Sequence, residues 1–182
     1  NAEYGLGMRL AVDHLNTLAF QLKDQVMQNA GGDLKQALEE IASLDEQRAD
    51  QAAFNRTNLA VDKLKDLLKD AKEGTPEGEL KENLSYLKYK AVWIVGGDGW
   101  AYDIGYGGLD HTIASGLDVN LLVLDTEVYS NTGGQMSKST PRAATAQFAS
   151  SGKKMPKKNM GMIFSTYGNV YVAQISLGAN PN

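Results

Sequence analysis

The spacing of apolar residues changes at about residue 90, and this change constrains the fold more than any other feature of the sequence. Before that point apolar side chains recur every three or four residues, which places them on one face of a helix. After it they form short continuous runs that end in glycine, which is typical of buried, parallel strands. The first helix is expected over residues 3–28, with an apolar face made of Met8, Val12, Leu15, Ala19, Leu22 and Val26.

The rest of the first half is expected to be a charged helical segment, residues 33–73, followed by a linker. "NAGGD" breaks the first helix, and Asp33 is expected to be the N-cap of the next one. Charged residues surround a narrow apolar stripe that neither Gly nor Pro interrupts, so a solvated helical hairpin is expected. "GTPEG", residues 74–78, is a turn sequence and is expected to end the helical region, which spans residues 1–90.

The second half, residues 91–182, alternates strand and helix patterns, which predicts an α/β fold with a parallel sheet and flanking helices. Right-handed crossovers then place binding groups at the carboxyl ends of the strands. Thr140 and Pro141 are expected to be the cap and the first residue of a helix. We expect strands at 91–95, 119–126 and 161–168, helices at 101–116, 140–150 and 169–179, and a loop at 127–137.

Composition excludes several classes of function. The chain has 182 residues and a formal net charge of −4, whereas nucleic-acid-binding domains usually carry a basic excess, so no nucleic-acid partner is expected. It has no cysteine, which excludes disulfides and thiolate metal sites within it. No apolar run approaches the ~20 residues of a membrane span, and no secretory signal is visible. The first residue is Asn and the last five are "GANPN", so a piece of a longer protein is expected.

The charges of the second half are segregated along the sequence. Residues 91–137 contain six acidic residues and no Lys or Arg, whereas residues 138–182 contain six Lys or Arg and no acidic residue. This pattern suggests that a cation or an anion is handled where the two segments meet. The most basic stretch, "SGKKMPKK" at residues 151–158, is expected to be an exposed loop.

Two motifs follow the first two strands of the predicted sheet. "GGDG", residues 96–99, lets the backbone approach an anion, but Asp98 would repel a bare phosphate. A divalent cation between them removes this conflict, because Mg²⁺ binds one or two carboxylates together with substrate phosphates. "DTEVYSNTGGQ", residues 125–135, adds the oxygen donors of Thr126 and Asn131. The simpler alternative is that Asp98 caps a turn or helix, and the spacing does not fit a Rossmann fingerprint.

The stretch "GDGWAYDIGYGGLDHTIASGLDVNLLVLDTEVYSNTGGQMSKSTPR", residues 97–142, resembles the thiamine-diphosphate-binding domain of pyruvate:ferredoxin (flavodoxin) oxidoreductases. "NAEYGLGM" and "GMIFSTYGNVYVAQISLGAN" are similar to segments of the same family. The resemblance covers roughly the whole chain and is weakest over residues 33–90. It implies that both halves together form one domain of a larger enzyme.

This resemblance implies a role for each residue of the two motifs. Asp98, the hydroxyl of Thr126 and the main-chain carbonyl of Val128 would bind Mg²⁺, which holds the cofactor diphosphate. Thr126 stands where thiamine enzymes in general have asparagine, and this departure matches the oxidoreductase family. Asn131 would lie beside the substrate and the thiazolium and take part in catalysis. The full cofactor-binding set is then Gly97, Asp98, Gly99, Trp100, Thr126, Val128 and Asn131.

The resemblance also implies an activity for the larger enzyme. It would oxidatively decarboxylate a 2-oxo acid, pyruvate first among them, with coenzyme A to acyl-CoA and CO₂. Electrons would pass through [4Fe-4S] clusters, which have no ligands in this chain, to ferredoxin or flavodoxin. The carboxylate that activates thiamine would come from another domain, so this chain alone is expected to be inactive. A cytoplasmic homodimer is expected, or one in a hydrogenosome-like organelle.

Other functions remain open from the sequence. A related 2-oxo acid oxidoreductase could use another substrate or pass electrons to NADP. A phosphate- or nucleotide-binding α/β module without redox chemistry would also use a glycine-rich loop after a strand. In a third class, the helices of residues 1–90 would bind a partner and the α/β part would be a scaffold. The basic stretch 151–158 could contact an acidic electron carrier or a neighbouring domain.

Overall fold

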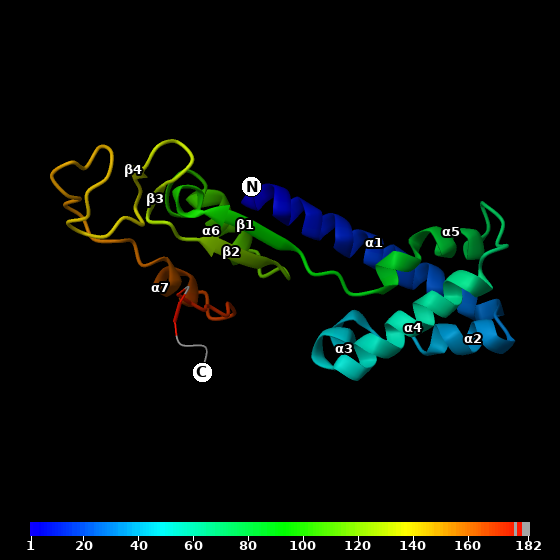
Figure 1. Cartoon of the computed structure of the whole chain (residues 1–182). Helices are drawn as coiled ribbons and strands as arrows, with labels where there is room; N and C mark the ends of the chain where they lie inside the picture. Colours follow the sequence, from blue (N-terminus) through cyan, green and yellow to red (C-terminus); the bar gives the residue numbers. More distant parts are fainter. Residues whose placement is uncertain (177, 180–182) are drawn as a thin grey trace. The chain divides into compact units, whose positions relative to one another are not determined.

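The computed structural model describes residues 1–176, 178 and 179, which divide into two compact units. Residues 10–91 form a helical unit, and residues 1–9 form an α/β unit with residues 92–182. Figure 1 shows the elements of both. The first residues of the chain thus pack with the α/β part, whereas the sequence pattern groups them with the helices. Within the described residues, no helix is long and apolar enough to cross a membrane.

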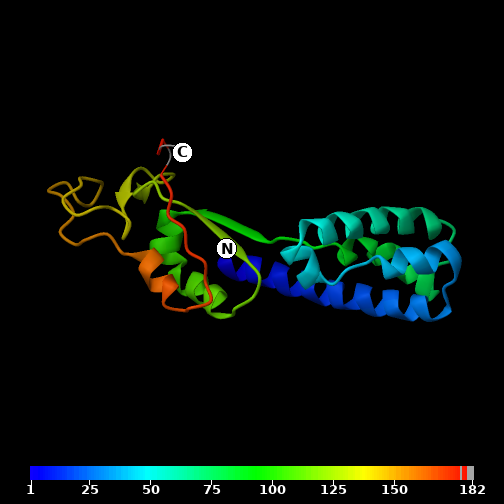
Figure 2. The ribbon, with the colours of Figure 1, turned by 90° about the horizontal axis from the view of Figure 1, so that it is seen from below.

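The helical unit has its own apolar core. Leu22 and Val26 of the first helix pack with Leu38, Leu64 and the other buried residues of this cluster. Figure 2 shows the course of the helices of residues 10–91. The elements are α1 (Ala2–Asn29), α2 (Gly32–Glu39), α3 (Leu44–Ala49), α4 (Gln51–Leu67), α5 (Pro76–Asn83) and the 3₁₀ helix η1 (Leu84–Leu87).

Side-chain caps divide the charged segment into three helices, not the expected hairpin. Ser43 accepts a hydrogen bond from the backbone of Glu46 and begins α3, and Asp50 accepts from Ala52 and Ala53 and begins α4. Both are residue types that favour this position. The expectation for Asp33 is wrong, because the N-cap of α2 is Gly31 and Asp33 lies in the first turn. The expected linker is short, since α5 already begins at Pro76.

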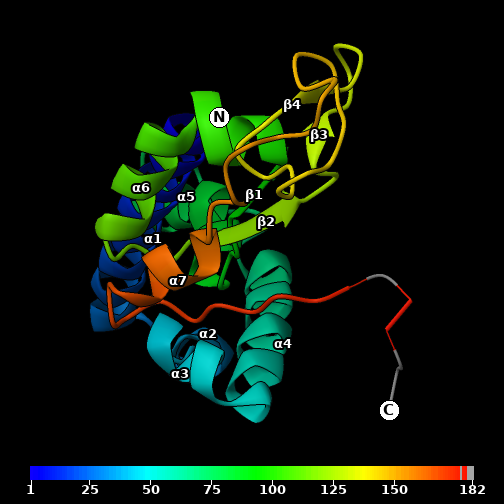
Figure 3. The same ribbon diagram turned by 90° about the vertical axis from the view of Figure 1, so that its left-hand side faces the viewer.

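The α/β unit is built on two parallel strands, β1 (Trp93–Gly97) and β2 (Asn120–Leu124). Between them run a π-helix, η2 (Gly99–Ile104), and α6 (Tyr106–Ala114). Later in the chain, α7 (Met160–Ser165) packs on α6, and the rings of Tyr106 and Phe164 stack. Both helices lie on the same side of the strands (Figure 3) and share a core with Leu121 and Val123. A mixed α/β fold with a parallel sheet and flanking helices is therefore present.

The two strands are buried on one face only, whereas the sequence predicts burial on both. Ile94 of β1 faces the core. Residues on the opposite face are exposed: Trp93, Val95, Leu122 and Leu124 have 61%, 53%, 41% and 53% of their surface accessible. The register pairs Val95 with Leu122, so these side chains share one face. Continuous apolar runs indicate burial on both faces, but the residues that the structure describes cover only one of them.

Three expected elements after residue 137 are wrong. Residues 161–168 are not a strand, because Asn159 caps α7 and Met160 and Phe164, four residues apart, both face the core. Residues 140–150 form turns, since Ala143 and Phe148 have positive φ angles that end any helix. Residues 169–176 are irregular, and residue 177 of the expected last helix lies outside the described residues.

Candidate metal centre

Asp98 lies directly after β1, at the carboxyl end of the two-stranded sheet. Its side chain is almost fully buried, with 1% exposed. The Thr126 hydroxyl donates to Asp98 Oδ1 at 2.9 Å, the Thr126 N–H donates to the same oxygen at 3.3 Å, and the Ser137 hydroxyl donates to Oδ2 at 2.7 Å. A buried carboxylate is stable only when it is paired or hydrogen-bonded. Asp98 is thus the centre of a network, and not the simple turn residue that the motif alone allows.

Among the three oxygen atoms expected to bind metal, Thr126 Oγ1 lies at the separation of neighbouring octahedral ligands from each of the other two. Thr126 Oγ1 is 2.9 Å from Asp98 Oδ1 and 3.1 Å from the carbonyl oxygen of Val128. Neighbouring ligands that each lie about 2.0–2.1 Å from Mg²⁺ are separated by about 2.9 Å. All three are hard oxygen donors, which suit Mg²⁺. The residues present therefore fit a magnesium ion.

A left-handed backbone conformation at Glu127 joins two of these donors. Its φ angle is 65°, which is unfavourable for a residue with a Cβ by roughly 1–2 kcal/mol. The Thr140 hydroxyl donates to the carbonyl of Glu127 and holds this conformation. The short strand β3 (Val128–Tyr129) then pairs antiparallel with β4 (Gln135–Met136), and this hairpin returns the chain to Asp98.

The glycines around Asp98 differ in their surroundings. A Cβ at Gly99 would overlap the ring of Tyr129, approaching three of its atoms to 3.0 Å or less, whereas a Cβ at Gly97 would meet nothing within 4 Å. The ring of Trp100 packs between Gly96 and Gly105 and joins the core of the unit. Gly99 is therefore needed for packing of the loop of residues 125–137, called here the metal loop, and Gly97 leaves open space beside Asp98.

The structure does not bring Asn131 to the three oxygen donors. It is exposed in the turn between β3 and β4, and among the described residues it makes no hydrogen bond to Asp98, Thr126 or Val128. Two serines that sequence reasoning missed lie closer. Ser130 Oγ is 2.6 Å from Thr126 Oγ1, and Ser137 contacts Asp98 itself. Ser137 is 39 residues beyond Asp98, and no local pattern pairs them.

The basic segment packs onto the acidic metal loop, which accounts for the segregation of charge along the sequence. Lys157 Nζ lies 2.6 Å from Asp125 Oδ2 and 3.5 Å from Glu127 Oε1, and Lys138 lies 2.6 Å from Asp103. Burial alone would raise the pKa of Asp125, but hydrogen bonds from Lys157 and Ser139 outweigh it and lower that pKa. This carboxylate therefore stabilises the loop at neutral pH, and the stabilisation is lost as acid protonates it.

The stretch 151–158 is thus only partly an exposed loop, contrary to expectation. Lys153 is 9% exposed and donates to the carbonyl of Thr140 at 2.6 Å. Lys158 lies over the ring of Tyr106 and donates to the carbonyl of Tyr102. Of its four lysines, only Lys154 is largely exposed to solvent. Reversing all four charges would disrupt the fold of the loop and is not a clean test of binding to an acidic carrier.

Replacing Lys157 with glutamate is expected to destabilise the metal loop. The new carboxylate would face Asp125 and Glu127 at a half-buried position, and the free energy of unfolding should fall by about 1–3 kcal/mol, between the values for exposed and buried pairs. Thermal unfolding measures the change. Lys154→Glu makes the same change of charge at an exposed position and should be neutral. Equal effects of the two would contradict the packing role of Lys157.

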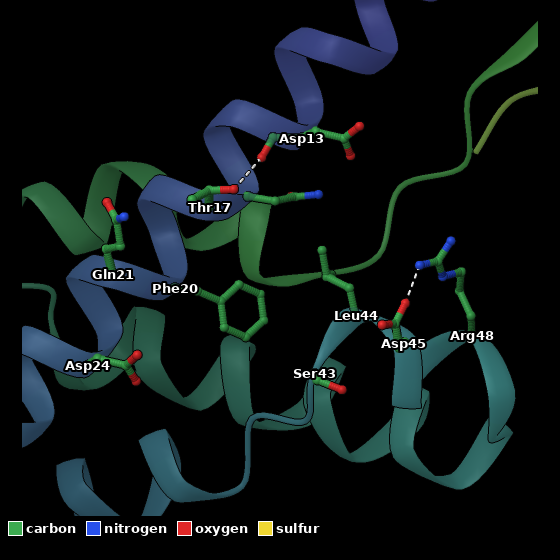
Figure 4. Close-up of a pocket in the computed structure, with 10 residues that line it drawn as sticks. Asp13, Thr17, Phe20, Gln21, Asp24, Ser43, Leu44, Asp45 and Arg48 are labelled. Carbon is green, nitrogen blue, oxygen red and sulfur yellow. Dashed lines mark hydrogen bonds and ion pairs between the residues drawn. The ribbon is translucent and has the colours of Figure 1, made fainter. Parts of the chain in front are cut away.

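The helical unit contains a separate open hollow between α1 and the start of α3 (Figure 4). It has a volume of about 470 Å³. Asp45 and Arg48 form an ion pair on its rim. Across the described chain, no group of three or more His, Cys, Asp or Glu could hold a metal, so its acidic residues form no such centre. The residues that line it are Asp13, Asn16, Thr17, Phe20, Gln21, Asp24, Ser43, Leu44, Asp45 and Arg48.

One family of known proteins matches the part of the chain that contains Asp98. Residues 84–179, just over half of the chain, match the family described as thiamine pyrophosphate enzyme, C-terminal TPP binding domain. The matched range contains β1, β2 and all the residues around Asp98.

Similar proteins extend the match to nearly the whole chain. A pyruvate-flavodoxin oxidoreductase of Trichormus variabilis is 50% identical over 184 residues, 98% of this chain and 15% of the relative. That of Enterobacter agglomerans is 51% identical over 187 residues, 100% of this chain and 16% of the relative. A pyruvate:ferredoxin oxidoreductase of Moorella thermoacetica is 45% identical over 189 residues, 99% of this chain and 16% of the relative. The chain spans about one sixth of the length of these relatives. It belongs to the thiamine pyrophosphate enzymes, through their C-terminal TPP-binding domain.

Proposed function

We propose that this chain supplies the magnesium- and diphosphate-binding half of a thiamine diphosphate site in a larger oxidoreductase. One observation carries this proposal: Thr126 Oγ1 lies at octahedral ligand separations from both Asp98 Oδ1 and the Val128 carbonyl oxygen, at the carboxyl ends of two parallel strands. Family membership supports the thiamine cofactor. The metal and the diphosphate contacts are the step added by the proposal.

Each residue of the centre has a part in holding the cofactor. Asp98, Thr126 and Val128 would each give one oxygen to Mg²⁺, and diphosphate oxygens and water would complete the coordination. Gly97 leaves room for the diphosphate, since no atom lies within 4 Å of the position of its absent Cβ. Thiamine diphosphate supplies the stabilisation of the carbanion left when the bond beside a keto group breaks. Asn131, exposed in its turn, would reach the substrate side only when the rest of the site is present.

The larger enzyme would act on pyruvate and pass electrons to flavodoxin or ferredoxin. The names of the relatives support both parts of this proposal. Coenzyme A as acyl acceptor and iron–sulfur clusters as carriers complete it. Because this chain has no cysteine, any such cluster must be held by residues elsewhere in the enzyme.

Calorimetry with thiamine diphosphate, ATP and NAD, each with and without Mg²⁺, tests the binding role in the larger enzyme. Of the three compounds, we expect only thiamine diphosphate to bind tightly. This binding should require Mg²⁺, because three of the proposed metal ligands come from this segment. Binding of ATP or NAD in its place would point to a nucleotide-binding module.

The 182-residue chain by itself tests the proposal that it holds only half of the site. We expect weak binding of magnesium thiamine diphosphate and no consumption of pyruvate, because the family resemblance implies that the carboxylate for the aminopyrimidine comes from another domain, and the chain has no cysteine to bind a cluster. Robust turnover of pyruvate by this chain alone would contradict the half-site proposal.

A further inference from the structure

Glu127 is held in its left-handed conformation by hydrogen bonds to both of its main-chain polar groups. Its N–H donates to Asp125 Oδ1 at 3.1 Å, and its carbonyl accepts the hydroxyl of Thr140. The φ angle of 65° is otherwise unfavourable for a residue with a Cβ. Thr126 and Val128 lie on either side of Glu127, so its backbone conformation sets the 3.1 Å separation of their two proposed metal donors.

Thr140 reaches Glu127 from an anchored position. Its side chain is buried, with 1% exposed. Its Oγ1 accepts a hydrogen bond from the backbone N–H of Ser137 at 2.9 Å, and its single proton is donated to the carbonyl of Glu127. The buried side chain of Lys153 donates to the main-chain carbonyl of Thr140 at 2.6 Å. The Thr140 hydroxyl is therefore fixed in direction as well as in place.

We propose that Thr140 is a positioning residue of the metal centre, whose hydroxyl holds Glu127 left-handed so that the Thr126 hydroxyl and the Val128 carbonyl can bind one Mg²⁺. Mg²⁺ requires near-ideal octahedral geometry, so a donor that is turned away lowers the affinity. Without the Thr140 hydrogen bond, Glu127 can relax to ordinary backbone angles and carry the Val128 carbonyl with it. Binding of the ion must then restore the unfavourable conformation. This inference rests on the proposed magnesium thiamine diphosphate site.

Titration of Mg²⁺ into the larger enzyme at saturating thiamine diphosphate, followed by calorimetry, tests this role. Thr140→Val keeps the shape of the side chain and removes the hydroxyl. The affinity for Mg²⁺ should fall roughly tenfold, the equivalent of one residue forced into the left-handed conformation. Thr140→Ser keeps the hydroxyl and should bind Mg²⁺ as the unsubstituted enzyme does. Thr140→Cys has a weak donor of similar size, should also lower the affinity, and provides the answer if the valine variant does not fold.

A second substitution separates positioning from general stabilisation of the metal loop. Glycine adopts positive φ angles without strain, so Glu127→Gly in the Thr140→Val or Thr140→Cys background should restore most of the lost affinity. Glu127→Gln is the matched control, because it makes the same change of charge and keeps the Cβ, and it should restore none.

Two results would overturn the positioning role while the proposed function stands. One is unchanged Mg²⁺ affinity in both Thr140→Val and Thr140→Cys, and the other is equal effects of Glu127→Gly and Glu127→Gln. Absence of any metal-dependent binding of thiamine diphosphate in the unsubstituted enzyme overturns both the positioning role and the proposed function.

Discussion

Replacing Asp98 with asparagine is expected to abolish metal-dependent binding of thiamine diphosphate in the larger enzyme. The substitution keeps the shape of the side chain and removes the only carboxylate among the three proposed metal donors. Loss of an outer-shell partner alone costs about 10–100-fold in metal affinity, so loss of this direct ligand should cost more than about 100-fold. Calorimetric titration of Mg²⁺ at saturating thiamine diphosphate measures the change.

The control for this prediction is Asp110→Asn, which makes the same change of charge on α6. Asp110 accepts a hydrogen bond from Tyr167 at 2.7 Å and has no contact with the metal donors in the described residues. This variant should bind the cofactor as the unsubstituted enzyme does. If Asp98→Asn kept full metal-dependent affinity, Asp98 would be a structural turn residue and the proposed site would be wrong.

Replacing Gly99 with alanine is expected to disrupt both the packing of the metal loop and the metal centre. The added methyl group would overlap the ring of Tyr129, which cannot remain in place. Tyr129 follows Val128 in β3, so its displacement also moves the carbonyl that is proposed to bind metal. Overpacking of this kind costs about 1–3 kcal/mol of the free energy of unfolding. Thermal unfolding and calorimetry with magnesium thiamine diphosphate measure the two effects.

Gly97→Ala is the matched control, two residues away in the same motif. Its added methyl group would meet no atom within 4 Å, so thermal stability should be unchanged. If the diphosphate occupies this space, cofactor affinity should still fall. We expect Gly97→Ala to lose cofactor affinity and keep its thermal stability. We expect Gly99→Ala to lose both cofactor affinity and thermal stability. Similar stability of the two variants would contradict the packing role of Gly99.

Much of the proposed site could be predicted from the sequence, because its residues lie in short motifs at the ends of strands. Asp98 follows an apolar run directly, and carboxyl ends of parallel strands meet at one edge. The roles of Thr126 and Val128 came from the family resemblance, and in the structure the Thr126 hydroxyl lies within hydrogen-bond distance of both Asp98 and the Val128 carbonyl. Ser137 could not be predicted, because the hairpin of β3 and β4 brings it to Asp98 from 39 residues away.

The fold was predictable where local pattern and tertiary contacts agree. The burial of Ala19, Leu22 and Val26 on α1 and the parallel pairing of β1 with β2 both follow from hydrophobic periodicity, whereas Met8 of the expected α1 face is 46% exposed. The pattern failed at residues 161–168, because a short apolar run suits a buried strand or a buried helix equally well. The segment is a helix in the structure, because Met160 and Phe164 both pack in the core cluster that α6 also lines.

The sequence by itself determined the class of the fold, the family and the carboxylate on which the site is centred, because these depend on residue type and local spacing. Tertiary structure alone decided which side chains complete the site. Lys157 reaches Asp125 across 32 positions of sequence, and Ser137 reaches Asp98 only after the chain has turned back. Such contacts depend on how the loops fold against one another, and no local spacing encodes that.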